Sequence, residues 1–283
     1  MANGSEHLFD AAAFALHGKL THPIHHEIKH TAHSKLSAEG GYVHERSEKY
    51  RAEGVISYES AYTHVAGNAD KKGNHAWSTI SSSVIERFNI MDVVTADRMV
   101  AQILTYHPLN GYVPEVIFLG TRFENLRIAG HPVKVDLRLD PLGATAPANG
   151  YLSDNAFRNY MTQQRAEIWR PGPPQEVKDR YPQNLPTPAI PGSIETSLVY
   201  KAEKVTGDEY PGTNFGHVIV VPYFGKIYLA TLKVTESDPA PGAANVPMKT
   251  RLTLKMIEFE MGSMGGGSGS AGGASNNGNN PPG

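Results

Sequence analysis

Apolar and charged residues alternate without interruption between positions 133 and 139. The apolar positions are Val133, Val135, Leu137 and Leu139, and the residues between them are Lys134, Asp136 and Arg138. Successive side chains of a β-strand point to opposite faces, so this spacing predicts a strand with one buried and one solvated face. Further β-type runs with short polar connections precede it from Ala76 onward. The pattern predicts a β-meander over residues 55–139.

Composition supports one large β-rich domain over residues 8–261. The 283 residues include 28 Gly and 20 Pro, which favour a turn-rich β fold over a helical one. Lys and Arg (26) nearly balance Asp and Glu (28), and there is no basic stripe, so we expect no nucleic-acid partner. The chain has no cysteine, which excludes disulfides and thiolate metal sites.

Residues 1–7 are expected to form a flexible N-terminus, and Leu8–Leu20 a strand, although its alanines favour a helix. Residues 67–74 are typical of a hairpin loop. Two alternatives fit residues 93–106. Val93, Ala96 and Val100 can line one face of a helix, whereas a strand buried on both faces also explains them. The flanking β runs favour the strand.

A helix is predicted after residue 153, capped by Ser153 or Asp154 and ending near Trp169, because prolines follow. Helix and proline-rich connection together occupy residues 153–192, and Tyr181–Gly192 is expected to lie extended over the sheet. A second β block spans residues 194–261. The buried positions change parity near Met256, which predicts a β-bulge there.

These elements predict an all-β fold, an antiparallel β-sandwich made of the meander and the second β block, with one short helix. Residues 262–283 contain almost only Gly, Ser, Ala, Asn and Pro. This composition predicts a flexible tail, which would be suited to lying along a neighbouring subunit.

The segments VVTADRMVAQ and ENLRIAGHPVKV resemble parts of uncharacterised bacterial all-β proteins, including those called choice-of-anchor P. The resemblance covers about a fifth of the chain and rests on common strand and turn residues. It implies an all-β fold, at or outside the cell surface, without a known activity. The chain departs from that family because no signal peptide or surface anchor is recognisable.

Five histidines are close together in the sequence, at His22, His25, His26, His30 and His33. On a helix they would share an arc of about 140°, and pairs four residues apart can chelate Zn²⁺ through neutral imidazoles. Lys29 would sit among these ligands, however, and Pro23 opposes an early helix start. The alternative is a polar segment facing solvent. We therefore carry a zinc site as one hypothesis and no cofactor as the other.

A hydrolytic site could combine Asp92 or Asp97 with His107 or His131 and a serine from 81–83. No G-x-S-x-G motif is present, and the three serines are expected to form an exposed strand face. Tyrosines could form a sugar-binding or protein-binding face if several shared one surface. The relevant residues are Tyr58, Tyr62, Tyr106, Tyr112, Tyr200, Tyr223 and Tyr228.

The sequence therefore predicts a non-enzymatic structural or interaction protein that self-associates, as a homo-oligomer or filament, through β edges and the C-terminal tail. The alternative is a metal-dependent or carbohydrate-binding protein that uses His22–His33. No run is long and apolar enough to span a membrane, and no signal peptide is visible. We accordingly expect a cytoplasmic location, with a surface location reached by unconventional export or in a longer precursor.

Overall fold

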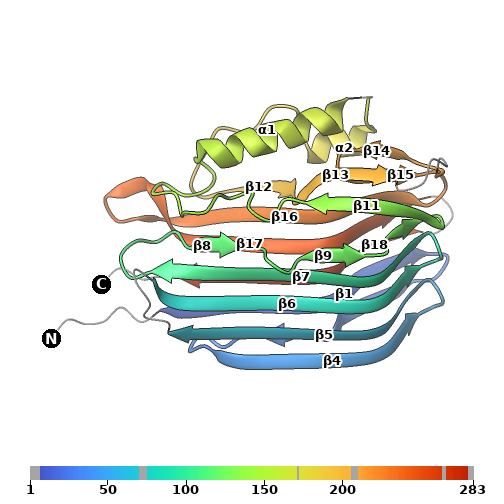
Figure 1. Cartoon of the computed structure of the whole chain (residues 1–283), viewed down its shortest axis with the longest axis horizontal. Helices are drawn as coiled ribbons and strands as arrows, with labels where there is room; N and C mark the ends of the chain where they lie inside the picture. The colour runs from blue at the N-terminus through green and yellow to red at the C-terminus, as the bar shows by residue number, and fades with distance from the viewer. Residues whose placement is uncertain (1–6, 70–74, 171, 205–209, 263–265, 280–283) are drawn as a thin grey trace.

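The structure is a computed structural model, and it describes residues 7–69, 75–170, 172–204, 210–262 and 266–279. Two nine-stranded antiparallel sheets pack face to face, and two short helices lie against one of them (Figure 1). The predicted all-β sandwich is confirmed. In the described part of the chain, no helix is long and apolar enough to cross a membrane.

The first sheet, called sheet I, has the strand order β14-β15-β16-β17-β18-β1-β2, with β12 also paired to β16 and β3 to β1. Its strands are β1 (Leu8–His22), β2 (His26–Thr31), β3 (Ser34–Lys35), β12 (Gly192–Ser197), β14 (Thr213–Phe215), β15 (Val218–Val221), β16 (Gly225–Ala240), β17 (Ala243–Met261) and β18 (Gly266–Asn279).

The second sheet, called sheet II, has the order β13-β11-β10-β7-β6-β5-β4, with β8 and β9 also paired to β7. Its strands are β4 (Gly41–Ala52), β5 (Ile56–Ala69), β6 (His75–Ile90), β7 (Val94–Pro108), β8 (Glu115–Ile117), β9 (Arg122–Glu124), β10 (Arg127–Ile128), β11 (His131–Leu137) and β13 (Val199–Lys204). The meander thus begins at β4, before the predicted residue 55.

The main core fills the space between the sheets. Sheet II contributes Ile56, Ile85 and Met99, and sheet I contributes Leu16, Leu229 and Phe259, all with less than 1% of their surface exposed. The strand predictions for Leu8–Leu20 and 93–106 are confirmed by β1 and β7. Strand β7 has buried residues at both parities because burial changes parity along it, from Val94 and Ala96 to Met99, Ala101 and Ile103.

Helix α1 (Asn155–Trp169) is capped as predicted, since Asp154 Oδ2 accepts a hydrogen bond of 2.8 Å from the Phe157 amide. A second helix that was not predicted, α2 (Gln175–Arg180), follows the prolines. Helix α1 runs along the edge of the sandwich above β12 and β13, and α2 lies beside β14 (Figure 1). Ile168 of α1 and Val177 of α2 pack there against Tyr228 of β16.

The prediction of a flexible tail is wrong for residues 266–279, which form strand β18. This strand lies in the middle of sheet I and is paired along its length with β17 on one side and β1 on the other. Its glycines are matched to bulky neighbours: a β-carbon at Gly269 would lie 2.7 Å from Cζ of Phe259. Residues 266–279 thus have a composition typical of disorder, yet they form a strand whose small residues fit the narrow space between two long strands.

Small residues on β18 allow the two sheets to approach closely. Cα atoms of β18 come within 8 Å of those of β6 and β7, whereas packed sheets are usually about 10 Å apart. The amide of Asn276 donates hydrogen bonds to the carbonyls of Thr79 (2.9 Å) and Ile103 (3.0 Å). The prediction that the serines at 81–83 are exposed is wrong: all three are buried, and Ser83 donates to the Phe14 carbonyl of sheet I.

Each sheet is crossed by a line of residues at which the side-chain parity changes. In sheet I, Ala230 and Gly272 have positive φ and lie on either side of Met256, on the two neighbouring strands. In sheet II, Lys49 and Arg87 have positive φ and lie on either side of Glu59 in the same way. Burial on β17 shifts from Leu254 and Met256 to Ile257 and Phe259, as predicted. The predicted β-bulge is wrong, because the register to β16 and β18 is the same on both sides of Met256.

The remaining N-terminal and loop predictions can be placed only in part. Residues 1–6 of the expected flexible N-terminus, and residues 70–74 of the hairpin loop, lie outside the described residues. His7 is buried and stacks on Trp77 with ring centroids 4.8 Å apart, so the N-terminal prediction is wrong at that residue. Strands β5 and β6 are paired as the hairpin prediction requires.

Candidate functional site: the open edge of β4

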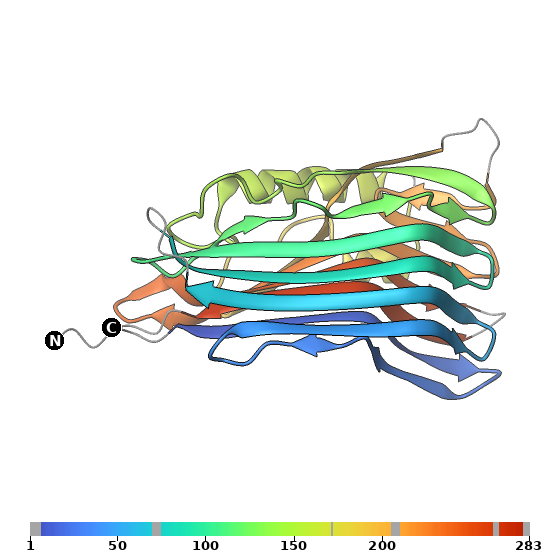
Figure 2. The same cartoon turned by 60° about the horizontal axis from the view of Figure 1, so that its bottom comes forward.

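Strand β4 is the long outer edge of sheet II. It pairs antiparallel with β5 from Gly41–Gly67 to Ala52–Ile56, and among the described residues no strand is paired to its other side (Figure 2). The other terminal strands of the two sheets are shorter: β2 and β13 have six residues each and β14 has three, against twelve in β4. An unpaired strand of this length offers a row of backbone donors and acceptors to another chain.

The side chains of β4 are mostly exposed and charged. Arg46 and Glu48 point to the same side and form an ion pair of 2.6 Å, with 68% and 62% of their side chains exposed. Glu45, Lys49 and Arg51 are exposed as well. Ser47 faces the other side and accepts a hydrogen bond of 2.8 Å from the Tyr58 hydroxyl. The edge therefore carries two acids and three bases and contains no proline, so every residue keeps its backbone N–H.

The sequence analysis did not find β4, because its pattern is polar on both faces. Val43, Ser47 and Tyr50 are only half-buried, and Ala52 is the one fully buried residue of the strand. A strand whose two faces are both only partly covered lacks the apolar alternation by which strands are recognised. The usable signal was local: Gly40 and Gly41 both have positive φ and end the preceding turn, which marks a strand start.

The five candidate zinc ligands lie on strands and turns rather than on a helix. His22 ends β1, His25 lies in the turn, His26 and His30 belong to β2, and His33 follows β2. Among the described residues, no group of three or more His, Cys, Asp or Glu side chains is placed to hold a metal ion. The helical arc assumed for these residues is wrong, and zinc binding stays a prediction without that geometric support.

Two of these histidines instead stack with a third one from β1. The imidazole of His30 lies 4.6 Å from that of His17 and 5.0 Å from that of His33, measured between ring centroids. His17 Nε2 is 2.8 Å from the Ser270 hydroxyl of β18. Burial, followed by the neighbouring His30, lowers the pKa of His17 to about 4, so this ring is neutral at pH 7.

The residues considered for a hydrolytic site are not brought together. Asp92 lies in the turn between β6 and β7 and accepts a hydrogen bond from Asn89, whereas His107 lies at the opposite end of β7. Asp97 accepts a hydrogen bond from Asn125, Ser81 and Ser83 are buried between the sheets, and Ser82 is buried on the other face of β6. Burial also lowers the pKa of His107 to about 3.

The tyrosines do not form one exposed face. Tyr58 and Tyr228 are buried, while Tyr200 and Tyr223 are 64% and 78% exposed on different elements. Tyr106 and Tyr112, together with Leu109 and Glu115, line a surface cavity of about 500 Å³. Sugar binding by stacked tyrosines therefore stays a prediction.

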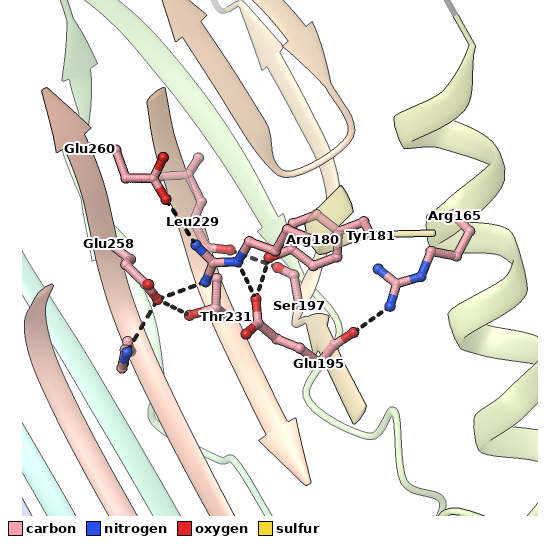
Figure 3. Close-up of polar contacts among 10 residues, drawn as sticks. Arg165, Arg180, Tyr181, Glu195, Ser197, Leu229, Thr231, Glu258 and Glu260 are labelled. Atoms are coloured by element: carbon pink, nitrogen blue, oxygen red, sulfur yellow. Dashed lines mark hydrogen bonds and ion pairs between the residues drawn. The ribbon is translucent and has the colours of Figure 1, made fainter. Parts of the chain in front are cut away.

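A dense polar cluster lies where α2 meets sheet I, and Arg180 is at its centre (Figure 3). Arg180 forms ion pairs with Glu195 of β12 (2.8 Å), Glu258 of β17 (3.0 Å) and Glu260 of β17 (3.7 Å). Its guanidinium also lies 4.0 Å from the centre of the Tyr228 ring. Lys226 pairs with Oε2 of Glu260, and Lys255 pairs with Oε2 of Glu258, the oxygen that Arg180 also contacts.

The charges of this cluster satisfy one another. Burial raises the pKa of Glu258, but Lys255 and Arg180 lower it by more, so the net pKa is below the ordinary value. Burial lowers the pKa of Arg180, and Tyr181, Glu195 and Glu258 more than offset that effect. Glu258 therefore stays ionised beside Lys255 and Arg180. The cluster fastens α2 to β12 and β17, which is a structural task.

The fold and its open edge define the class of protein: a bent, two-sheet antiparallel β-sandwich with one long, charged, unpaired edge strand. Residues 7–235 match the model of a family described as a domain of unknown function (DUF8256), and the chain belongs to this family. The match ends within β16 and does not include β17 and β18. Comparisons with curated proteins and with solved structures gave no match.

Proposed function

We propose that this chain is a non-enzymatic interaction protein that associates with copies of itself through the edge of β4. The observation that carries the proposal is a twelve-residue strand whose second side has no strand partner among the described residues. Strand addition at an open edge supplies main-chain hydrogen bonds without needing a pocket. The cluster around Arg180 and the buried serines and histidines are accounted for by packing, which supports a binding rather than a catalytic role.

The charges of β4 limit which strands can pair with it. Charged side chains on an edge ordinarily keep sheets from joining. Here, however, the two acids and three bases of β4 are interspersed, so the edge does not carry one sign of charge along its length. A partner strand with the complementary order of charges can therefore dock, whereas most others are repelled.

Light scattering after size exclusion tests the proposal on the full chain at micromolar concentrations. We expect a dimer that dissociates on dilution, and amide hydrogen exchange that slows along β4 as the protein concentration rises. The variant Glu45→Lys/Glu48→Lys gives β4 charges of one sign, and we expect it to be monomeric. The matched control Asp140→Lys/Glu176→Lys makes the same change in net charge at exposed sites away from β4 and should associate like the wild type. A wild-type chain that stays monomeric throughout would refute self-association.

A further inference from the structure

The charges from Glu45 to Lys49 are self-complementary when the strand is reversed about Ser47. Two residues on either side of Ser47 stand Glu45 and Lys49, and one residue on either side stand Arg46 and Glu48. We propose that two copies of this chain join antiparallel through β4, in the single register that places Ser47 opposite Ser47 of the other copy. This inference rests on the proposed self-association and specifies its geometry.

In this register the charges on the outer face of β4 are complementary. Arg46 of one copy lies opposite Glu48 of the other, and this pair occurs twice because of the symmetry. Residues directly opposite each other on antiparallel strands have their side chains on the same face and in contact. Glu45 and Lys49 are opposite each other in the ladder, but their side chains lie on different faces, because Glu45 shares the face of Ser47 and the parity changes at Lys49. The ion pair of 2.6 Å that Arg46 and Glu48 already form within one copy would become part of a four-residue network.

Neighbouring registers bring like charges together. Shifting the pairing by one residue places Glu45 opposite Glu48 in one direction and Arg46 opposite Lys49 in the other. Shifting it by two places Arg46 opposite itself or Glu48 opposite itself. Like charges directly opposite are destabilising. The charge pattern of β4 therefore selects the register centred on Ser47 from the five nearest ones.

The backbone of β4 is compatible with a continuous ladder in this register. Lys49 has a φ of 39°, yet the β4–β5 pairing keeps its register across it, from Glu48–Ser60 to Tyr50–Tyr58. In the existing sheets, each such residue faces one with ordinary backbone angles, as Lys49 faces Glu59 and Ala230 faces Met256. Glu45, which would face Lys49 of the other copy, also has ordinary angles.

The arrangement is a closed dimer. A two-fold interface uses the same surface on both copies, so it leaves no free β4 edge for a third copy. It joins the two nine-stranded sheets II into one continuous sheet and predicts a dimer rather than the filament that the sequence alone left open.

Reciprocal charge reversals test the register. We expect Arg46→Glu to dimerise about tenfold or more weakly than the wild type, because the introduced carboxylate then faces Glu48 of the other copy, twice in each dimer; Glu48→Arg should be weakened equally. When the two variants are mixed, both cross-strand pairs of the heterodimer are again of opposite sign. The mixture should therefore form a heterodimer more tightly than either variant pairs with itself.

The outcomes separate this inference from the proposal on which it rests. Mutual rescue of the two variants supports the register. A wild-type dimer that the single reversals do not weaken, or that mixing does not rescue, overturns the register and leaves self-association standing. A monomeric wild type overturns both. A failure to fold would be seen in the circular dichroism of each variant, and such a variant is replaced by the shorter reversal Arg46→Asp or Glu48→Lys.

The absence of cysteine from the sequence allows a second measurement. Opposed Cα atoms on antiparallel strands are about 4.5 or 5.5 Å apart, which is within the range that a disulfide spans. Under mild oxidation, Ser47→Cys should cross-link two copies at low micromolar concentration. The control Val43→Cys, which would face Arg51, should not. Equal cross-linking of both variants would contradict a pairing centred on Ser47.

Discussion

The ring of Phe14 on β1 lies directly over the backbone of Gly273 on β18. The two residues are opposite each other in the β1–β18 ladder, and a β-carbon at position 273 would overlap the ring. An aromatic ring that covers a cross-strand glycine shields its backbone from water and fills the space that a side chain would otherwise occupy. The β18 strand is therefore shaped by its neighbours, and its low-complexity composition is a packing requirement.

Replacing Gly273 by valine should destabilise the protein by about 1–3 kcal/mol, the usual cost of overpacking a tight site. Urea unfolding measures the change. Gly262→Ala is the matched control, because the nearest atom to its β-carbon would be 3.6 Å away, and it should cost much less. Adding Phe14→Ala to Gly273→Val should make the valine itself less costly. A valine tolerated as well as the control substitution would contradict the close contact.

Ending the chain at Met261 should prevent it from folding as a monomer. Without β18, strands β17 and β1 would each lose a partner along most of their length and leave two open edges within sheet I. Circular dichroism should show loss of β structure, and light scattering should show aggregates. Retention of the wild-type thermal midpoint by a monomeric truncated chain would show that β18 is dispensable.

Asn276→Asp should cost more than Asn276→Ala. The amide of Asn276 donates to the Thr79 and Ile103 carbonyls, and a carboxylate in the same place would direct an acceptor at two acceptors in a buried position. We expect a loss of about 3 kcal/mol or more for the aspartate and about 1–3 kcal/mol for the alanine. Guanidinium unfolding at pH 7 measures both. The reverse order would contradict donation by the Asn276 amide to these two carbonyls.

Arg180→Met should lower the free energy of unfolding by about 2–4 kcal/mol at pH 7, because it leaves Glu195 and Glu258 without their shared cation. In the wild type, the lowered pKa of Glu258 means that its contribution is full above its ordinary pKa and is lost as pH falls below it. In the variant only Lys255 still supports that contribution, so it is smaller, and the difference between the two proteins should shrink in acid. A difference independent of pH would argue against ionic coupling.

Stability should fall as pH decreases from about 6.5, because His107 stays neutral in the folded state and is protonated in the unfolded one. Burial lowers its folded-state pKa to about 3, so the loss continues down to that pH. His107→Phe should reduce the slope of unfolding free energy against pH between 6.5 and 3 by up to about 1.4 kcal/mol per pH unit. Urea unfolding at pH 7, 6 and 5 gives the slope. An unchanged slope would place His107 in contact with water.

Sequence reasoning found the elements that have a regular pattern. Alternating residues around Val133 predicted β11, and the parity change on β17 was visible although its cause was not. That cause is left-handed backbone at Ala230 and Gly272 on the neighbouring strands, which β17's own residues do not record. Local capping chemistry was also legible, as Asp154 shows.

Elements whose burial depends on a distant strand were missed. Ser81 and Ser83 are buried because small residues of β18 let the sheets approach, and no signal near position 81 shows that. Strand β18 was not predicted for the same reason, because its glycines are explained by the rings of Phe14 and Phe259 on the neighbouring strands. The polar edge β4 was missed for the opposite reason, since neither of its faces is fully covered. The histidine arc failed because β2 was assumed to be a helix.

The pairing of Ala13 with Ala274 has a consequence for how this protein is made. Strand β1 is synthesised about 250 residues before β18, the strand that pairs with it, so this edge of β1 has no partner during most of translation. At typical synthesis rates that delay is on the order of ten seconds or more, and such distant contacts form slowly. Sheet II, built from consecutive hairpins, can assemble during that time and offer its inner surface as a template on which the other sheet closes.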